Sequence, residues 1–321
     1  MYPSDMTAIL SDDFLARVAA RTSQCDIRIW GFGVGPALVG LVRAAQQLHE
    51  IAWLDRVESL VSPSLVAPPD LTDHLISIEA LLALNRARPS VSIDSSVTRF
   101  TDAIILAKRP VENEPPVHRP DLPALSRTLW VDCMHTDGPG LTAIGLTEAA
   151  CRSAEEVSAV LQDASGLFSH SYDIAARKAN GIHWGRGQGW ALHGLVLGTA
   201  TDALTDRLNR LLHAIARFEL DGRWRTIIDN PAAPFEASVS AIVASGILLG
   251  VSRGSVSSDW LPMARRALRA AAGMADEHGG LTVSDATPAA ATASYLTRAS
   301  GVFPWGQGPL LLALIEGRNH L

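Results

Sequence analysis

The chain has 321 residues, of which 47% are hydrophobic and 19% are charged, and its formal net charge is −6. This length allows one large domain or two ordinary ones with a sizeable core. The low and slightly acidic charge excludes a basic nucleic-acid-binding face and a polybasic membrane patch, so we expect neither nucleic acid nor a membrane as a partner.

The N-terminal residues and the cysteine and histidine spacing bear on location and on metal binding. The first residues, Met-Tyr-Pro-Ser-Asp-Met, lack the basic start and apolar core of a secretion signal, so a cytoplasmic location is expected. The longest apolar run, residues 238–251, is shorter than the roughly 20 residues that a membrane span needs. Cys25, Cys133 and Cys151 are odd in number and have no paired spacing, and no His-Glu-x-x-His occurs. We therefore predict no disulfide framework, no required metal and no cofactor.

Residues 12–21 are predicted as a short amphipathic helix. The next segment, residues 27–35, could be a strand that enters a glycine-rich turn, with Asp55 about 20 residues further on, as in a dinucleotide site. However, its glycines are spaced Gly-x-Gly-x-Gly, which misses the fingerprint, and the apolar residues that follow keep a helical period. We therefore predict a helical hairpin of residues 35–49 and 51–61, and no nucleotide site.

Helical periodicity continues to the end of the chain. Residues 71–86 and 91–107 form a second predicted hairpin, broken at Pro89. Residues 109–127 contain five prolines and little periodicity, so they are predicted as a long surface loop. Further helices are predicted at residues 140–152, 155–162, 190–200, 205–219, 236–249, 260–275, 289–299 and 309–316.

The fold class follows from this pattern. Strand signals are nearly absent and most turns are short, so the predicted fold is all-α with antiparallel neighbours. Helices 190–200, 236–249 and 309–316 are apolar nearly all round, whereas helix 260–275 is two-faced, which indicates an inner layer shielded by an outer one. Six hairpins in a ring, an (α/α)6 barrel in a single domain over residues 1–321, satisfy this pattern. An open solenoid of helical pairs is the alternative.

The stretch 183–193, His-Trp-Gly-Arg-Gly-Gln-Gly-Trp-Ala-Leu-His, is interpreted as a glycine-rich loop ahead of a buried helix. Its glycines allow the backbone to approach a ligand. Trp184 and Trp190 offer flat stacking faces and Arg186 offers a fixed cation, a combination that suits an acidic sugar. The alternative is a glycine-rich turn whose tryptophans belong to the core.

Three side chains elsewhere are candidates for chemistry. Asp132 lies among apolar neighbours that disfavour its charged form, which would let it deliver a proton near neutral pH. It could instead cap a helix, a role that Asp137, directly before Gly-Pro-Gly, fits better. Asp73 lies at the start of an apolar helix that Asp70 can cap, so Asp73 is free for another role. His170 follows Phe-Ser in a loop, where it could contact a ligand or be a satisfied structural histidine.

Five segments, taken in chain order, carry a family resemblance: Trp130-Val-Asp, Gly166-Leu-Phe-Ser-His-Ser-Tyr-Asp, Trp184-Gly-Arg-Gly-Gln-Gly-Trp, Glu236-Ala-Ser and Gly306-x-Gly-x-Leu-Leu-Leu-Ala. They resemble the unsaturated rhamnogalacturonyl hydrolases, glycoside hydrolase family 105, and more distantly the unsaturated glucuronyl hydrolases of family 88. The resemblance covers about residues 30–316. It implies an (α/α)6 barrel that removes a Δ4,5-unsaturated uronic acid from the end of a lyase-cut oligosaccharide.

By position, the resemblance implies that Asp132 is the catalytic aspartate and Asp73 the second acidic residue of the pocket. The enol-ether double bond would be hydrated, with Asp132 protonating C4 and then taking a proton from the water that attacks C5. The family usually has a Gly-Gly-Phe-Trp-His-Lys-like stretch about ten residues before that aspartate. Here the same place reads Asp121-Leu-Pro-Ala-Leu-Ser-Arg.

The resemblance also assigns the sugar contacts. His170, Trp184 and Arg186 match sugar-contacting positions, and Arg186 would hold the uronate carboxylate while Trp184 or Trp190 stacks on the ring. The expected partner is a small oligosaccharide with a terminal unsaturated uronate. The alternatives are a non-catalytic helical toroid that binds a glycan or a protein, and another sugar-processing enzyme on the same barrel.

Overall fold

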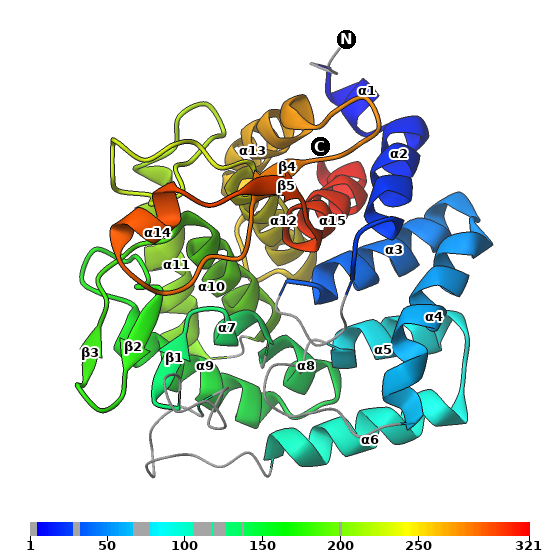
Figure 1. Cartoon of the computed structure of the whole chain (residues 1–321), viewed down its shortest axis with the longest axis horizontal. Helices are drawn as coiled ribbons and strands as arrows, with labels where there is room; N and C mark the ends of the chain where they lie inside the picture. Colours follow the sequence, from blue (N-terminus) through cyan, green and yellow to red (C-terminus); the bar gives the residue numbers. More distant parts are fainter. Residues whose placement is uncertain are drawn as a thin grey trace.

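The computed structural model describes residues 5–27, 33–66, 77–105, 117, 126–136, 138–198 and 201–321. Within these ranges the chain is mostly helical, and its helices form two concentric layers (Figure 1).

Six inner helices form a closed ring, because each contacts the next and the sixth contacts the first. In ring order they are α3 (Gly35–Leu48), α5 (Ser77–Ala87), α8 (Gly138–Ala143), α10 (Gly185–Gly198), α12 (Ala237–Arg253) and α15 (Pro304–His320). The contact between α15 and α3 excludes the open solenoid, whose end units do not meet. The predicted (α/α)6 barrel is confirmed.

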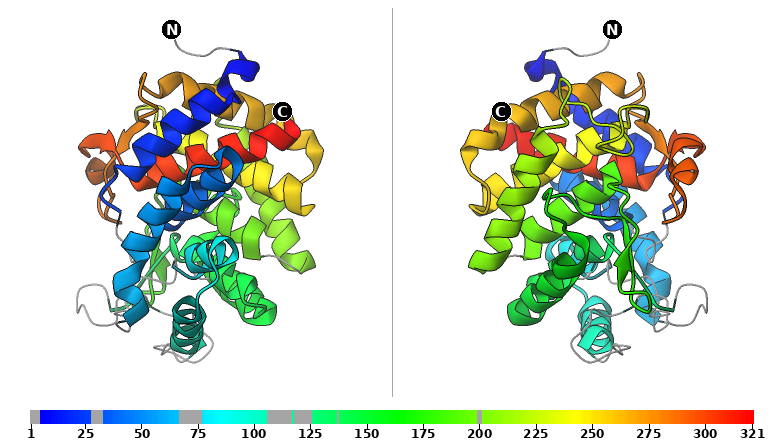
Figure 2. Two further views of the ribbon diagram at one scale, coloured as in Figure 1. Left: turned by 90° about the vertical axis from the view of Figure 1, so that its right-hand side faces the viewer. Right: turned by 90° about the vertical axis from the view of Figure 1, so that its left-hand side faces the viewer.

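An outer helix precedes each inner helix along the chain and shields the ring. The outer helices are α2 (Asp12–Ser23), α4 (Ile51–Val66), α6 (Val91–Ile105), α9 (Thr147–Leu161), α11 (Asp202–Ala216) and α13 (Leu261–Met274). The inner α12 is buried at every position from Ala237 to Gly250, whereas the outer α13 buries only the face that carries Met263, Ala267 and Leu268. This difference is the one that the sequence pattern predicted. Figure 2 shows from two sides how α2, in blue, lies along α15, in red.

Glycines allow two inner helices to approach a neighbouring segment closely. Gly308 of α15 lies against the backbone of Ala37 in α3, and Gly194 of α10 lies against the backbone carbonyl of Met134. A Cβ at either glycine would overlap main-chain atoms, which cannot move aside as a flexible side chain could. The contact of α15 with α3 in the ring therefore requires Gly308, and the contact of α10 with the segment at Met134 requires Gly194.

Three predicted helices have the wrong bounds. Residues 140–152 and 155–162 were expected as separate helices, but α8 ends at Ala143 and α9 runs unbroken through Thr147–Leu161. The break falls at Gly145, whose φ of 85° is left-handed. Residues 289–299 contain only the short α14 (Thr292–Leu296), because the chain then turns into a strand.

Two inner helices begin earlier than predicted. The glycine-rich stretch after Trp184 is the start of α10 rather than a loop, and α15 begins at Pro304, five residues ahead of the predicted start at Pro309. Glycine disfavours helix, but here neighbouring elements occupy the space that side chains would fill: Gly185 lies against the carbonyl of Arg225 and Gly189 against Ile242. Packing therefore decides the conformation of this stretch.

Short strands were missed by the sequence analysis. β1 (Thr128–Trp130), β2 (Ser171–Asp173) and β3 (Lys178–Ala179) form an antiparallel sheet in that order, and β4 (Thr282–Ser284) pairs with β5 (Ser300–Val302). Segments of two or three residues are too short for an alternating pattern to be detected.

The structure bears on the predicted surface loop and on membrane spans only through the residues that it describes. The loop predicted at residues 109–127 lies almost entirely outside the described residues. None of the helices in the described ranges combines the length and the apolar character needed to cross a bilayer.

Gly308→Ala is expected to lower the free energy of unfolding by about 1 to 3 kcal/mol, the usual cost of overpacking a core, because its Cβ would meet the backbone of Ala37. Gly273→Ala is the matched control, since nothing lies within 4 Å of its added Cβ in α13. It should instead stabilise the protein by about 0.5 to 1 kcal/mol. Urea unfolding of both variants checks this, and equal effects would contradict the close approach of α15 to α3.

Candidate active site

Pairing of β1 with β2 brings Asp132 and His170 together. Trp130 is opposite Ser171 in the sheet, and the backbone N–H of Val131 donates to the carbonyl of His170 at 2.9 Å. The next residue is Asp132, whose Oδ2 lies 3.5 Å from Nε2 of His170. The side chain of Asp132 is 14% exposed and that of His170 is 3% exposed. The structure thus places two of the predicted residues in one nearly buried pair.

A short helix fixes the backbone of Asp132. The N–H groups of His135 and Thr136 donate to the carbonyl oxygen of Asp132 at 3.0 and 3.1 Å, so this residue begins the turn of α7 (Cys133–Thr136). The strand before Asp132 and the helix after it leave its main chain little freedom, so its carboxyl group has a defined position.

Tyr295 orients the ring of His170. Its hydroxyl lies 2.6 Å from Nδ1 of His170, and Nδ2 of Asn180 donates to the same hydroxyl at 3.5 Å. Burial raises the pKa of Tyr295 above its ordinary value; the charge of Asp132 raises it further, and the hydrogen bond from Asn180 opposes this. A protonated phenol can donate to Nδ1, an arrangement that puts the ring proton on Nε2, the nitrogen that faces Asp132.

Arg186 is fully buried in the first turn of α10. Its Nε donates to Oγ of Ser238 at 3.1 Å, and its Nη2 donates to the carbonyl and hydroxyl oxygens of Ser284 at 2.7 and 2.6 Å. Oε1 of Glu236 lies 3.6 Å from Nη2. Nη1 is buried and has no hydrogen-bond partner among the described residues. One nitrogen of the guanidinium is therefore left for another acceptor.

The surrounding charges compensate for the burial of Arg186. Burial lowers the pKa of the guanidinium, and the carboxylates of Glu236 and Asp132 act in the opposite direction. Glu236 in turn accepts hydrogen bonds from Oγ of Ser238 at 2.8 Å and from the backbone N–H of Ser284 at 3.1 Å. The same group of polar residues thus connects α10, α12 and β4.

The two predicted tryptophans have different surroundings. Trp184 is buried and stacks on the ring of His170, with ring centroids 4.5 Å apart, and Cζ of Arg186 lies 5.1 Å from the centroid of its ring. Trp190 is also buried, but it stacks on His135 with centroids 4.7 Å apart. The structure therefore brings Trp184 to the pair of Asp132 and His170, and places Trp190 in a different group of aromatic rings. Asp73 lies outside the described residues.

Sequence reasoning missed Tyr295 and Ser284, and it named Glu236 as the start of a helix and as part of the family resemblance without assigning it a role. Residues near Tyr295 were expected in a regular helix, and Ser284 belongs to a strand too short to detect. The signal that was available was Glu236 directly before an apolar helix, since a carboxylate there needs a partner when it is buried.

A hollow of about 360 Å³ borders this site. Glu236, Ser284 and Tyr295 line it together with Phe235 and Arg298. A hollow of this size accommodates a small ligand. In the part of the chain that the structure describes, no three His, Cys, Asp or Glu side chains are grouped so as to hold a metal ion.

Comparisons with known proteins identify relatives. Residues 15–320 match Glycosyl Hydrolase Family 88. The unsaturated rhamnogalacturonyl hydrolase YesR of Bacillus subtilis (strain 168) is 25% identical over 255 residues, which are 72% of this chain and 74% of YesR.

Solved structures share the fold. The structure of a possible member of the GH105 family from Klebsiella pneumoniae superposes with a TM-score of 0.84 at 19% identity, over 96% of this chain and 93% of that one. The unsaturated glucuronyl hydrolase of Bacillus sp. GL1 gives a TM-score of 0.74 at 16% identity, over 94% of both chains. The likeness to both enzyme groups that the sequence suggested is confirmed.

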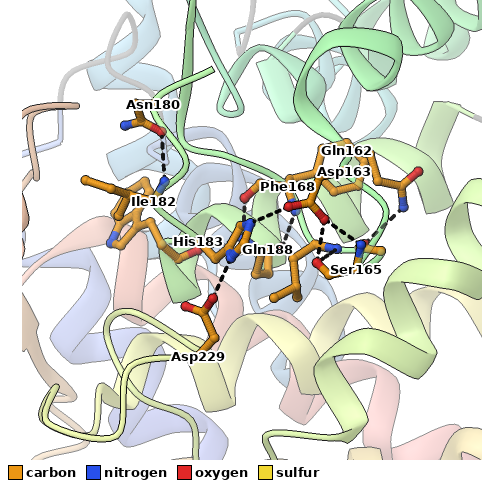
Figure 3. A network of polar contacts seen from close by, with 12 residues as sticks. Gln162, Asp163, Ser165, Phe168, Asn180, Ile182, His183, Gln188 and Asp229 are labelled. Atoms are coloured by element: carbon orange, nitrogen blue, oxygen red, sulfur yellow. Dashed lines mark hydrogen bonds and ion pairs between the residues drawn. The ribbon is translucent and has the colours of Figure 1, made fainter. Parts of the chain in front are cut away.

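His183 lies between two carboxylates, close to the start of α10. Nδ1 of His183 lies 2.7 Å from Oδ2 of Asp229, and Nε2 lies 3.0 Å from Oδ2 of Asp163, as Figure 3 shows. Asp163 follows α9 and Asp229 lies in the loop before α12. A protonated His183 therefore joins two loops on either side of the start of α10.

The charges set the pH range of this contact. Burial of the ring lowers the pKa of His183, but the hydrogen bonds and charges of Asp229 and Asp163 outweigh it, so the net shift is upward. The hydrogen bond from His183 is the largest cause of the lowered pKa of Asp229. For Asp163, burial raises the pKa, but hydrogen bonds from Ser165 and the charge of His183 outweigh it and lower the pKa.

His183→Gln is expected to destabilise the protein more at about pH 5.5 than at about pH 8.5. A raised histidine pKa gives stability that is complete below the ordinary value of 6.5 and is lost as the pH rises through the folded-state value. The lowered aspartate pKa values give stability that is complete above 3.8 and is lost in acid. Since both carboxylates are partly exposed, we expect at most about 1 kcal/mol at pH 5.5.

Thermal melts of wild type and His183→Gln at the two pH values check this. His278→Gln serves as the control, because His278 is exposed and its ion-pair partner, Glu277, is exposed as well. A loss in His183→Gln that is the same at both pH values would mean that packing, and not charge, is responsible.

Proposed function

Because the chain belongs to glycosyl hydrolase family 88 and is a glycoside hydrolase, we propose that it cleaves oligosaccharides that end in a Δ4,5-unsaturated uronic acid. The relatives support this substrate class, since YesR is named an unsaturated rhamnogalacturonyl hydrolase and a solved structural neighbour an unsaturated glucuronyl hydrolase. The observation that carries the proposal is the nearly buried pair of Asp132 and His170 beside the buried cation of Arg186. An acid with an adjacent anion-binding group suits a substrate that is both an enol ether and a carboxylate.

Asp132 is proposed as the proton donor and acceptor. Its carboxyl group would protonate C4 of the unsaturated sugar and take a proton from the water that attacks C5. The hydrated product is a hemiketal, which opens to a ketone and releases the remaining sugar. A single carboxyl group that first gives and then takes a proton returns to its starting state after each turnover.

His170 is proposed to position Asp132 and the substrate. Tyr295 would fix the ring so that an N–H at Nε2 faces Oδ2 of Asp132. A substrate hydroxyl placed between these two atoms could bond both of them. Trp184 stacks on the ring of His170 and also contacts the cation of Arg186, so it holds these two side chains together. We therefore propose that Trp184 acts on the sugar through these two residues.

Arg186 is proposed to bind the uronate carboxylate through Nη1. Its other nitrogens already hold Ser238 and Ser284, so the guanidinium has a fixed orientation before substrate arrives. A preorganised donor loses little entropy when the anion binds. The hollow lined by Glu236, Tyr295 and Phe235 would take a further part of the oligosaccharide.

Of the other two predicted site residues, Asp73 is kept in the proposed site and Trp190 is not. Asp73 stays proposed as the second acidic residue of the pocket on the strength of its position in the sequence. Trp190 is buried against His135, and the structure gives no support to a contact with sugar, so we do not include Trp190 in the proposed site.

The direct test is an assay on a panel of lyase-generated oligosaccharides with unsaturated galacturonate or glucuronate ends. Hydration of the conjugated double bond removes its ultraviolet absorbance, which gives a continuous rate. The saturated counterparts of the same oligosaccharides are the control. Release of sugar from the saturated compounds at the same rate would overturn the proposed chemistry, because an ordinary glycosidase does not need the double bond.

Asp132→Asn is expected to lower kcat by about 10² to 10⁴, the usual contribution of a positioned proton donor, with an unchanged melting temperature. Asp173→Asn is the matched control, because Asp173 lies on the adjacent strand β2 and is exposed. Its turnover should equal that of the wild type. If Asp132→Asn keeps more than about a tenth of wild-type turnover, Asp132 is not the proton donor.

Arg186→Lys is expected to lower kcat/KM by about one to two decades, because a lysine supplies one point charge and cannot both bond Ser238 and Ser284 and direct a donor at the carboxylate. It should also lower the melting temperature, since lysine cannot bond Ser238 and Ser284 together. Rates are therefore compared well below the melting temperature of the variant.

The matched substrate is the methyl ester of the unsaturated uronate. The loss of kcat/KM in Arg186→Lys should nearly vanish with the ester, because the ester offers no anion. Equal losses on both substrates would show that Arg186 only supports the structure.

A further inference from the structure

The barrel contains a second cavity, of about 490 Å³, which we call the axial cavity. Each inner helix contributes to its lining, and the contributing residues include Arg43, Arg86, Leu197, Arg253 and Glu316, which lie near the helix ends. Arg186 lies at the start of α10 and Leu197 near its end, about 16 Å further along the helix. The axial cavity thus extends from His135, three residues after Asp132, toward the ends of α10 and α12 that lie away from Asp132 and His170.

The walls and the rim of the axial cavity differ in character. The walls are apolar and are formed by Val39, Leu82, Leu197, Leu249 and Leu312. The rim carries Arg86 and Arg253, whose side chains are exposed. An apolar interior below a cationic rim is suited to an amphipathic anion.

The floor carries two buried histidines, His135 and His193, with ring centroids 5.9 Å apart. His135 is 3% exposed and His193 is fully buried. Neither ring nitrogen of His135, nor Nδ1 of His193, has a hydrogen-bond partner among the described residues. Leaving such groups unpaired in the interior is costly, so a ligand that pairs with them would be stabilised.

Both histidines are uncharged at neutral pH. Burial lowers the pKa of His135 to about 3, with a further contribution from His193, and lowers the pKa of His193 to about 4. A neutral imidazole presents one donor and one acceptor, so the floor matches an uncharged polar group such as a hydroxyl.

The other charged groups leave the rim positive. Arg43 is paired with Glu316 at 2.6 Å. Glu79 faces Arg86 and Arg253, and burial raises its pKa to about 7 while the two arginines oppose that shift. Near pH 7 the negative charge on Glu79 is therefore incomplete, and the two rim arginines retain an excess of positive charge.

We propose that the axial cavity is a second binding site, for a small organic carboxylate whose anionic end lies at Arg86 and Arg253 and whose uncharged polar end meets His135 and His193. The apolar walls take the body of the ligand. This site is independent of the hydrolytic site and does not rest on the proposed function.

The test is titration calorimetry near pH 7 with 4-hydroxyphenylacetate, which has a carboxylate, an apolar ring and a hydroxyl at the far end. We expect saturable binding of one molecule per chain. Its amide, 4-hydroxyphenylacetamide, should bind about ten-fold more weakly, because the charge that the rim arginines recognise is lost. Galacturonate, which has the carboxylate but no apolar body, should also bind more weakly.

Substitutions of residues that line the axial cavity test whether the ligand binds there. Arg253→Gln and Arg86→Gln should each weaken the carboxylate about ten-fold and leave the amide unchanged. His135→Phe keeps the stack on Trp190 and should weaken both ligands several-fold. Arg269→Gln, at an exposed position on the outer helix α13, is the matched control and should bind like the wild type.

Asp132→Asn distinguishes the two sites, because it should bind 4-hydroxyphenylacetate with wild-type affinity although its kcat is expected to fall by about 10² to 10⁴. The proposal is overturned by a lack of saturable binding, by equal affinities for acid and amide, or by galacturonate binding more tightly than the aromatic acid. Weakened binding in Asp132→Asn would also overturn it, because the ligand would then occupy the hydrolytic site.

Discussion

The buried guanidinium of Arg186 is the interaction on which the hydrolytic end of the barrel depends. A charge removed from water is stable only with compensating partners, and here they come from Glu236 before α12 and from Ser284 on β4. The first turn of α10, the start of α12 and the strand pair β4–β5 are therefore held in one arrangement. Trp184, two residues before Arg186 and directly before α10, then presents its ring to His170. The geometry of the site follows from satisfying one cation.

The sequence predicted the architecture because the inner and outer helices differ in a local property. Helix α12 is apolar all round and α13 on one face, and that contrast is visible without knowing which helices touch. Asp132 and His170 could be named because each lies in a recognisable segment. Their contact could not be predicted, since it arises from the register of Trp130 opposite Ser171 between two three-residue strands.

The glycine-rich stretch shows why the remainder was not predictable. Glycines spaced two apart fit a ligand-binding loop and equally fit a helix whose neighbours leave no room for side chains, and only the positions of Arg225 and Ile242 decide between them. Local sequence does not contain those positions. Tyr295 could not be predicted for the same reason, because its role comes from a hydrogen bond with His170, 125 positions earlier.

The contact between α3 and α15 has a consequence for biosynthesis. These helices lie at opposite ends of the sequence, yet the ring exists only when they touch. Until α15 leaves the ribosome, the apolar faces of α3 and α12 that it covers have no permanent neighbour. Such long-range closure slows folding and leaves nascent chains open to aggregation. Production of this enzyme should therefore be unusually sensitive to the rate of translation and to chaperone supply.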